Sequence, residues 1–298
     1  MKEMNFRDLS RIWLKYKGLT VKRTSLMQYE RIVTKYLDCY LGDISLDVLD
    51  IHHLLNCIES IKKDLSVKSL QDIIVVLKSI LKYGNSLGLC CIPLEMLPCI
   101  KIKKKEIEIF YDYELKIIEN YLIVNRTEKN LGIMICLHTG MRLGEICALE
   151  WNDIYLLNQK IFIHKTIHRI SENGKSYTVV GLPKTDTSIR SIPINKDLLK
   201  ILLSYQNKKG YIITGTEHYL DPRSYQYYFQ KVLNDLNIKT HKFHTLRHTF
   251  ATRCVQCQMD IKSLSEILGH SSVSITLSTY VHTSFDMKKE EMNKFKLV

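Results

Sequence analysis

The 298-residue chain lacks an apolar run long enough to cross a membrane. A membrane span needs roughly 18 consecutive apolar residues, and no run here approaches that length. Internal repeats and low-complexity tracts are also missing. We therefore expect no membrane contact and interpret the chain as a globular protein that can bury a sizeable core, since 45% of its residues are hydrophobic and 25% are charged.

Signals for export and for metal binding are missing as well. Residues 1–10 are charged and contain no apolar core segment, so nothing indicates secretion. The nine cysteines are then expected to be free thiols in a reducing cytoplasm. Cys254 and Cys257 form one CxxC pair, but no second Cys or His pair completes four zinc ligands. We interpret both as small buried side chains of a helix and expect no metal and no cofactor.

Positive charge is what the sequence has in excess. The 43 Lys and Arg residues against 31 Asp and Glu give a formal net charge of +12. Residues 1–105 alone contain 18 Lys and Arg against 11 Asp and Glu. Cations that neutralise phosphates release condensed counterions, so this balance favours nucleic acid as a partner. Charge alone leaves a merely basic protein as an equal alternative.

The first hundred residues have the apolar periodicity of consecutive amphipathic helices. The first apolar stripe runs over Phe6–Tyr16. A second helix is expected to begin at an N-cap formed by Thr24 or Ser25 and to end at Gly42. Residues 46–61 are expected to form the third helix.

A fourth helix is expected to open at Ser66 or Ser69 and to close at Gly84 and Gly88. Prolines and a run of lysines then break the pattern, which predicts a basic linker over residues 101–107. The length of the chain fits two domains on either side of it. We therefore expect domains over residues 1–100 and 108–298.

The second domain is expected to combine helices with a small antiparallel sheet. Helical periodicity appears over 113–124, 130–138 and 142–149. Alternating apolar residues and turn residues predict strands over 160–167, 176–180 and 188–194. Helices resume at Lys196. The predicted fold class is therefore mainly α, with a helical N-terminal domain followed by a mixed α+β domain.

One tyrosine lies in a chemically distinctive setting. Tyr280 is the only tyrosine after Arg247 and follows His270 by ten residues. A tyrosine can attack a phosphodiester, and arginine can grip the phosphate oxygens bidentately while it stays protonated. His244 and Arg247 are three residues apart, so one helical turn places them on the same face. Arg142 and Glu145 have the same spacing, which lets the glutamate orient the guanidinium.

Four segments carry a resemblance to a known family. They are Thr139–Glu145 (TGMRLGE), Pro183–Pro193 (PKTDTSIRSIP), His244–Thr252 (HTLRHTFAT) and Leu268–Tyr280 (LGHSSVSITLSTY). In this order they resemble the motifs of the tyrosine recombinase, or phage integrase, family. The similarity covers nearly the whole chain, in the short layout of Xer-type recombinases, without an extra N-terminal domain for arm-type sites. It implies a SAM-like core-binding domain followed by a catalytic domain.

The resemblance also implies a role for each residue of the motifs. Arg142 and Arg247 would hold the scissile phosphate, and Tyr280 would form a 3′-phosphotyrosine. Lys184 would protonate the 5′ oxygen; its neighbours favour it over Lys175, which lies in the same sheet region. His244 would assist proton transfer from the phenol, and His270 would donate a hydrogen bond to a non-bridging oxygen. Apart from the resemblance, the neighbouring His248 is expected to lie near the site and to be structural or merely satisfied in its hydrogen bonds.

The implied function is site-specific DNA recombination, whether integration, excision, inversion or resolution. The alternatives are a type IB topoisomerase and a DNA-binding module without activity. Expected partners are double-stranded DNA, accessory DNA-bending proteins and three further copies in a tetramer on DNA, with a monomer in its absence. An amphipathic tail over 286–298 would dock on a neighbouring protomer or on its own domain. Low-specificity candidates for DNA-backbone contacts are Lys22, Arg23, Lys68 and Lys78.

Overall fold

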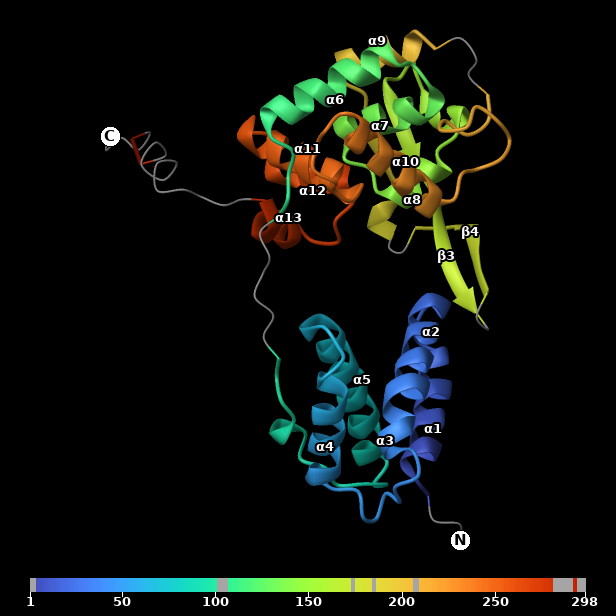
Figure 1. The fold of residues 1–298 in the computed structure, drawn as a ribbon, viewed down its shortest axis with the longest axis vertical. Coiled ribbons are helices and arrows are strands. Elements are labelled where there is room, and N and C mark those ends of the chain that lie inside the picture. The colour runs from blue at the N-terminus through green and yellow to red at the C-terminus, as the bar shows by residue number, and fades with distance from the viewer. Residues whose placement is uncertain are drawn as a thin grey trace. The chain divides into compact units, whose positions relative to one another are not determined.

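A computed structural model describes residues 4–100, 107–172, 175–183, 186–205, 209–280 and 292–293, with the backbone alone at 171, 172, 175 and 186. The chain divides into two compact units, Met1–Lys105 and Glu106–Val298 (Figure 1). Most of the regular structure is helical and the strands are antiparallel, so the predicted fold class is confirmed. Among the helices of the described residues, none is long and apolar enough to span a membrane.

The regular elements described in the first unit are all helical (Figure 1). They are α1 (Phe6–Gly18), α2 (Arg23–Ile32), the π-helical turn η1 (Val33–Leu37), α3 (Asp38–Leu41), α4 (Ile51–Lys62), α5 (Val67–Ser86) and the 3₁₀ turn η2 (Leu94–Met96). The Ser66 cap is confirmed, because its Oγ accepts a hydrogen bond from the Ser69 amide at 3.2 Å. Gly88 follows α5 with a left-handed φ of 69°, as expected of a glycine that ends a helix.

Two predictions of where a helix begins in this unit are wrong, and so is one prediction of where a helix ends, at Gly84. The chain already turns at Lys22, whose carbonyl accepts from the Ser25 amide, so α2 begins before the predicted cap at Thr24 or Ser25. The third helix begins at Ile51 instead of residue 46, because Asp50 caps it by accepting from the His53 amide.

Gly84 does not end α5 but lies inside it. A Cβ at this position would come within 2.8 Å of Leu9 Cδ2. The glycine therefore allows close packing of α5 against α1. The core between these helices includes Trp13, whose indole N–H donates to Ser79 Oγ at 3.2 Å.

The second unit surrounds short strands with helices (Figure 1). Its helices are α6 (Asp112–Val124), α7 (Glu128–Thr139), α8 (Leu143–Ala148), α9 (Lys196–Leu203), α10 (Pro222–Asp235), α11 (His244–Gln256), α12 (Ile261–Leu268) and α13 (Val273–Tyr280), with 3₁₀ turns η3 (Trp151–Asp153) and η4 (Asp186–Ser188). Its strands are β1 (Ile154–Tyr155), β2 (Lys160–Ile163), β3 (Thr166–Glu172), β4 (Lys175–Gly181) and β5 (Arg190–Pro193).

The strands form two antiparallel groups instead of one sheet. One group has the order β1-β2-β5, and the other is the β3–β4 hairpin, which projects from the helices in Figure 1. The single strand predicted over 160–167 is therefore two strands. Lys165, between them, binds Glu150 at 2.6 Å and Asp153 at 3.1 Å, and His164 binds Asp153 at 2.9 Å. These side-chain contacts hold the connecting residues out of both ladders.

Helix α7 is the centre of the second unit. Its residues are apolar on almost every side, as expected of a helix enclosed by others, and Ile133, Ile135 and Cys136 are fully buried. A smaller apolar cluster joins α11, α12 and α13 around Leu264, Leu268 and the Tyr280 ring. The helix that carries the predicted nucleophile is therefore anchored by packing.

Gly132 gives a test of the packing of α7. Alanine normally stabilises a helix interior relative to glycine. A Cβ here would collide with Ile213 and with Tyr225, whose hydroxyl is held by the Lys129 carbonyl at 2.6 Å. We expect Gly132→Ala to lower the free energy of unfolding by about 1–3 kcal/mol in denaturant titrations. The control Gly181→Ala, with only a 3.9 Å neighbour, should be near neutral, and a stabilised Gly132→Ala would contradict this packing.

Candidate active site

Four elements bring the predicted site residues together: the N-terminus of α8, helix α11, the loop after α12, and α13. Arg142 caps the start of α8, just after the sharp end of α7. Gly140 ends α7 with a left-handed φ of 64°, and a Cβ there would collide with Phe250. The Gly in the TGMR segment thus lets α7 and α11 approach closely enough to place Arg142 beside Arg247.

Three arginines converge on the C-terminal end of α12. Arg190 Nε donates to the Ile267 carbonyl at 2.5 Å. Arg247 Nη2 donates to the next carbonyl, Leu268, and Arg142 Nη2 to the one after it, Gly269, at 2.9 and 2.8 Å. The last carbonyls of a helix have no partner inside it and carry negative partial charge, so cations satisfy them well. The loop that leads to α13 is therefore fixed by the same side chains that line the site.

Glu145 joins two of these arginines. Its Oε1 and Oε2 accept from Arg190 Nη1 and Nη2 at 3.1 and 3.0 Å, and its Oε1 accepts from Arg142 Nη1 at 2.8 Å. Burial by itself would raise the pKa of this carboxyl, which is 3% exposed. The hydrogen bonds and charge of Arg190, together with the charge of Arg142, outweigh burial and lower the pKa to about 2. Glu145 therefore contacts the Arg142 guanidinium directly, in agreement with the orienting role expected of it.

Arg190 is a site residue that the sequence analysis missed. It lies within the PKTDTSIRSIP segment, but we gave it no role there. Only 9% of its surface is exposed, and it occupies an inward position of β5, in register with Ile192. A charged residue at an inward strand position needs a buried partner. The alternation of inward and outward residues along the strand could therefore have indicated that Arg190 pairs with a buried carboxylate such as Glu145.

Arg247 is almost completely buried, with 2% of its surface exposed. Its Nη1 donates to the Gly140 carbonyl at 2.9 Å and its Nη2 contacts His270 Nε2 at 2.9 Å. Burial lowers the pKa of Arg247 to about 10, and repulsion from Arg142 adds to the shift. The guanidinium remains charged at neutral pH, so it keeps a positive charge inside the protein that a phosphate can match.

The protonation of His270 follows from its partners. Arginine can only donate, so Nε2 of His270 must be the unprotonated acceptor. The proton of the neutral ring is then on Nδ1, which donates to Thr276 Oγ1 at 2.8 Å. Burial and the charges of Arg247 and Arg142 lower the pKa of this ring to about 4, in agreement with a neutral imidazole.

Tyr280 ends α13 with its hydroxyl against His248. The distance from Tyr280 Oη to His248 Nδ1 is 2.9 Å, and the Tyr280 side chain is almost buried, with 6% of the residue exposed. Burial raises the pKa of the phenol, while the nearby Arg247 charge offsets part of that rise. The Tyr280 and His270 rings lie parallel, with centroids 6.3 Å apart. His248 therefore contacts the reacting atom, a position that we had not expected for it.

His244 lies on the same face of α11 as His248, with ring centroids 4.7 Å apart. Part of the residue is exposed at the surface, yet desolvation by the surrounding protein lowers the pKa of its ring to about 4, with smaller contributions from His248, Arg247 and Arg142. The structure thus brings Arg142, Glu145, His244, Arg247, His270 and Tyr280 into one site. Lys184 lies outside the described residues.

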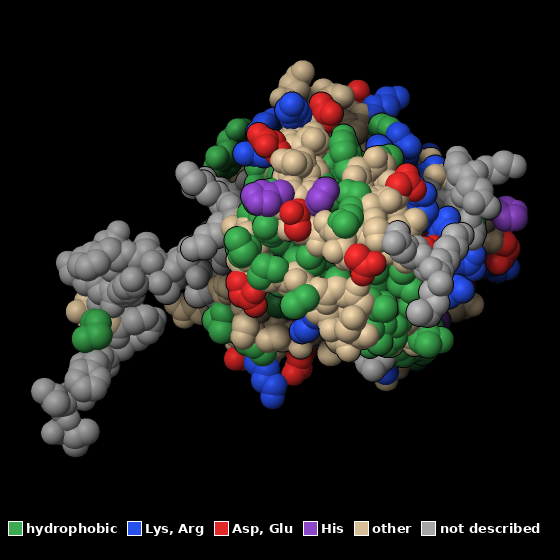
Figure 2. Space-filling view, turned by 90° about the horizontal axis from the view of Figure 1, so that it is seen from below, with side chains coloured by type: hydrophobic (Ala, Val, Ile, Leu, Met, Phe, Trp, Pro, Cys, Tyr) green, Lys and Arg blue, Asp and Glu red, His purple; other side chains and the backbone are tan. Residues whose placement is uncertain are grey.

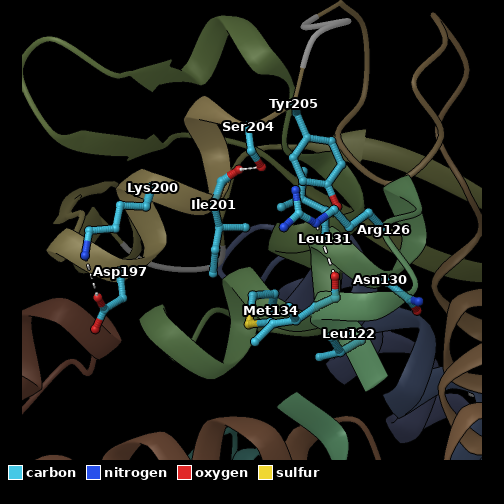
Figure 3. A pocket seen from close by; sticks show the side chains of 11 residues that line it. Leu122, Arg126, Asn130, Leu131, Met134, Asp197, Lys200, Ile201, Ser204 and Tyr205 are labelled. Carbon is cyan, nitrogen blue, oxygen red and sulfur yellow. Dashed lines mark hydrogen bonds and ion pairs between the residues drawn. The ribbon is translucent and has the colours of Figure 1, made fainter. Parts of the chain in front are cut away.

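The site opens on a hollow of about 420 Å³ lined in part by Arg142, His270, Gly269 and Pro183. An apolar pocket of about 380 Å³ between α6, α7 and α9 shares no lining residue with it, and Figure 3 shows the side chains there, among them Leu131 and Met134. That pocket contains none of the site residues.

The candidate DNA contacts have different surroundings. Lys22 and Arg23 are exposed at the start of α2. Lys68 is exposed and pairs with Asp72 at 2.7 Å, whereas Lys78 donates to the Leu97 carbonyl at 3.0 Å and so ties α5 to the segment after η2. On the face drawn in Figure 2, basic side chains are interspersed with acidic ones. Lys78 is therefore the weakest of the four candidates.

The prediction that both cysteines of the CxxC pair are buried is correct for only one of them. Cys254 is buried, and burial raises the pKa of its thiol to about 11, but Cys257 is exposed where α11 ends. Both thiols are free. Within the described ranges, no group of three or more His, Cys, Asp or Glu residues is placed to hold a metal ion.

Comparison with known proteins assigns the family. The model of the phage integrase family matches residues 102–287, and the chain belongs to this family of tyrosine recombinases. A XerC-like tyrosine recombinase of Caldanaerobacter subterraneus is 32% identical over 201 residues, which cover 59% of this chain and 51% of the relative. The ICEBs1 integrase of Bacillus subtilis is 31% identical over 173 residues, 52% of this chain and 45% of the relative. The chain spans about half the length of these relatives.

Two solved structures share the fold. The integrase of transposon Tn1549 in complex with circular intermediate DNA has a TM-score of 0.78 at 22% identity, covering 98% of this chain and all of that one. A lambda integrase tetramer bound to a Holliday junction has a TM-score of 0.69 at 16% identity, covering 96% and 80%. The chain therefore has the same fold as these two integrases.

The Glu145 pairs predict a large stability effect. Glu145→Gln removes the countercharge of the buried Arg190, so we expect the free energy of unfolding to fall by about 3–5 kcal/mol in denaturant titrations. Adding Arg190→Met should recover part of that loss, because the uncompensated charge is gone. As a control, Asp197→Asn should have little effect, since its pair with Lys200 is exposed. If Glu145→Gln alone is as stable as the control variant, the role given to Glu145 is excluded.

The lowered pKa of Glu145 also predicts a pH dependence. Its ionised form stabilises the folded state fully above the ordinary glutamate pKa of about 4.3, and this contribution is lost as the pH falls through about 2. We expect the stability difference between the wild type and Glu145→Gln to shrink steadily from pH 5 to pH 3, measured by urea unfolding. A difference that stays constant over this range would show that the carboxyl has an ordinary pKa.

Proposed function

We propose that this protein is a site-specific DNA recombinase that cleaves and rejoins strands through a 3′-phosphotyrosine. The observation that carries the proposal is the convergence of Arg142, Arg247 and Tyr280. Both guanidiniums bind successive carbonyls at the C-terminal end of α12, and the phenol lies within reach of the Arg247 charge. Phosphodiester cleavage by a protein nucleophile needs this combination of a nucleophile and fixed cations.

In the proposed reaction, Tyr280 Oη forms a bond to the scissile phosphorus and the bond from phosphorus to the 5′ oxygen breaks. Arg142 and Arg247 hold the non-bridging oxygens as charge builds on them. Lys184 supplies the proton that the leaving 5′ oxygen takes up. A 5′-hydroxyl of the partner strand then attacks the phosphotyrosine, so the bond energy is conserved and no cofactor is needed.

The role proposed for His270 requires a change of its hydrogen bonds. Its Nε2 accepts from Arg247 in the structure and cannot donate to a phosphate in that state. A phosphate that binds Arg247 would draw the guanidinium away, and its negative charge would raise the pKa of the ring. His270 would then gain a proton and donate it in a hydrogen bond to the non-bridging oxygen.

We assign DNA binding to both units. The first, residues 1–100, is proposed as the core-binding domain and 101–107 as a basic linker that follows the backbone, while 108–298 is the catalytic domain. The excess of cations in residues 1–105 supports this assignment. Lys22, Arg23 and Lys68 are proposed backbone contacts, with Lys78 given a lesser part because it is engaged within the unit.

Recombination of two duplexes uses four active sites, so we propose a tetramer assembled on DNA, with a monomer in its absence and DNA-bending proteins as accessory partners. The likeness to a lambda integrase tetramer on a Holliday junction supports this assembly. We place the reaction in the cytoplasm, in keeping with nine free cysteines. The tail over 286–298, proposed to dock on a neighbouring protomer, lies outside the described residues except for 292–293.

Covalent capture tests the proposed chemistry. Duplexes with a nick between randomised flanks are incubated with the protein, and the sequence trapped most efficiently in denaturant-resistant complexes becomes the capture duplex. We expect wild type to form this adduct and Tyr280→Phe to form none while it binds the duplex equally well. The control Tyr227→Phe changes an exposed tyrosine of α10 and should match wild type. An adduct that persists in Tyr280→Phe would refute the assignment.

The products separate the remaining alternatives. A recombinase exchanges flanking segments between two plasmids that carry the captured site, whereas a type IB topoisomerase only relaxes supercoils. Binding without an adduct would indicate a DNA-binding module without activity.

A further inference from the structure

The hydroxyl of Tyr280 has a histidine partner, and it is not the one that the motif spacing indicated. His248 Nδ1 lies 2.9 Å from Tyr280 Oη. The two residues are 32 positions apart, and the contact exists because the Tyr280 ring of α13 shares an apolar cluster with Ala251 and Cys254 of α11. His244 is one turn earlier on α11 and contacts His248 edge to face.

The direction of this hydrogen bond follows from the chemistry of its neighbours. The pKa of the phenol is raised, so Tyr280 keeps its proton at neutral pH. Arg247, the charged group nearest the hydroxyl, can donate but cannot accept. The proton of Oη is therefore directed to His248 Nδ1, with the ring proton on Nε2. Burial and the Arg247 charge lower the pKa of His248, which keeps the ring neutral and able to accept.

We propose that His248 is a catalytic residue that accepts the proton of Tyr280 during strand cleavage, an inference that rests on the proposed function. The Oη–H bond breaks and the proton moves to Nδ1 as Oη bonds to phosphorus and the 5′ oxygen leaves with the proton of Lys184. In rejoining, the phosphorus–Oη bond breaks and Nδ1 returns the proton to the phenol. The same contact keeps the hydroxyl oriented before DNA binds.

The variant His248→Asn separates proton transfer from positioning. In His248→Asn the amide takes the place of Nδ1, so it can still bond to the hydroxyl but cannot accept its proton. On the capture duplex we expect binding like wild type and adduct formation slower by about 100-fold or more. His218→Asn, an exposed histidine outside the site, is the matched control and should be unchanged. His244→Asn tests the rival assignment.

The pH dependence distinguishes loss of a base from a structural defect. Without a base the rate depends on the phenolate fraction, so for His248→Asn it should rise roughly tenfold per pH unit between pH 6 and 8.5. Wild type should be nearly independent of pH there and fall only as His248 protonates. Arg247, the charged group that acts on His248, stays charged over this range, and the titration of His244 and His270 is shared by both proteins.

Chemical rescue gives a second measure that holds even if His248→Asn shifts the tyrosine. Added imidazole should accelerate adduct formation by His248→Ala at least tenfold and leave Tyr280→Phe inactive. A duplex with sulfur as the bridging 5′ atom should restore Lys184→Ala, whose leaving group then needs no acid, and should not restore His248→Asn.

Each remaining result is decisive. The proposal is overturned if His248→Asn keeps the wild-type rate, if it is slow without a pH slope or imidazole rescue, or if the slope and rescue belong to His244 variants instead. If wild type itself forms no adduct, it is the proposed function that fails.

Discussion

The C-terminal end of α12 is the point on which the rest of the site depends. The last two carbonyls of the helix and that of the Gly269 cap accept from Arg190, Arg247 and Arg142, one each, and Glu145 neutralises only part of this charge. Guanidiniums this close repel one another and lose hydration, so they stay only where fixed acceptors compensate. The protein therefore holds a net positive centre before any phosphate arrives. Such preorganisation is what stabilises charge in a transition state most effectively.

Local sequence determined much of this arrangement. The spacing of Arg142 and Glu145 placed both on the first turn of α8, and the spacing of His244 and Arg247 placed both on one face of α11. The lone Tyr280 was recognisable because no other tyrosine follows Arg247. These inferences succeeded because each needs only one helical turn or a count along the chain.

Contacts between distant elements could not be predicted in the same way. Whether His244 or His248 contacts the phenol depends on where α13 packs against α11. The sequence of α11 alone does not determine that position. Arg190 escaped notice for a similar reason, since its partner Glu145 is 45 positions away. The split of the predicted strand over 160–167 depends on the contacts of Lys165 with Glu150 and Asp153. Those contacts exist only once the turn η3 has placed the two acidic side chains beside Lys165.

The protonation states of the site follow from the same charge centre. The arginines stay charged while the rings of His248 and His270 stay neutral, because cations and burial both oppose a further positive charge. A neutral ring is what a proton acceptor for the phenol must be. A bound phosphate would reverse the balance, because its negative charge favours protonated imidazoles. The anion that the arginines hold would thus also strengthen the tendency of His248 to take the proton of Tyr280, which couples substrate binding to activation of the nucleophile.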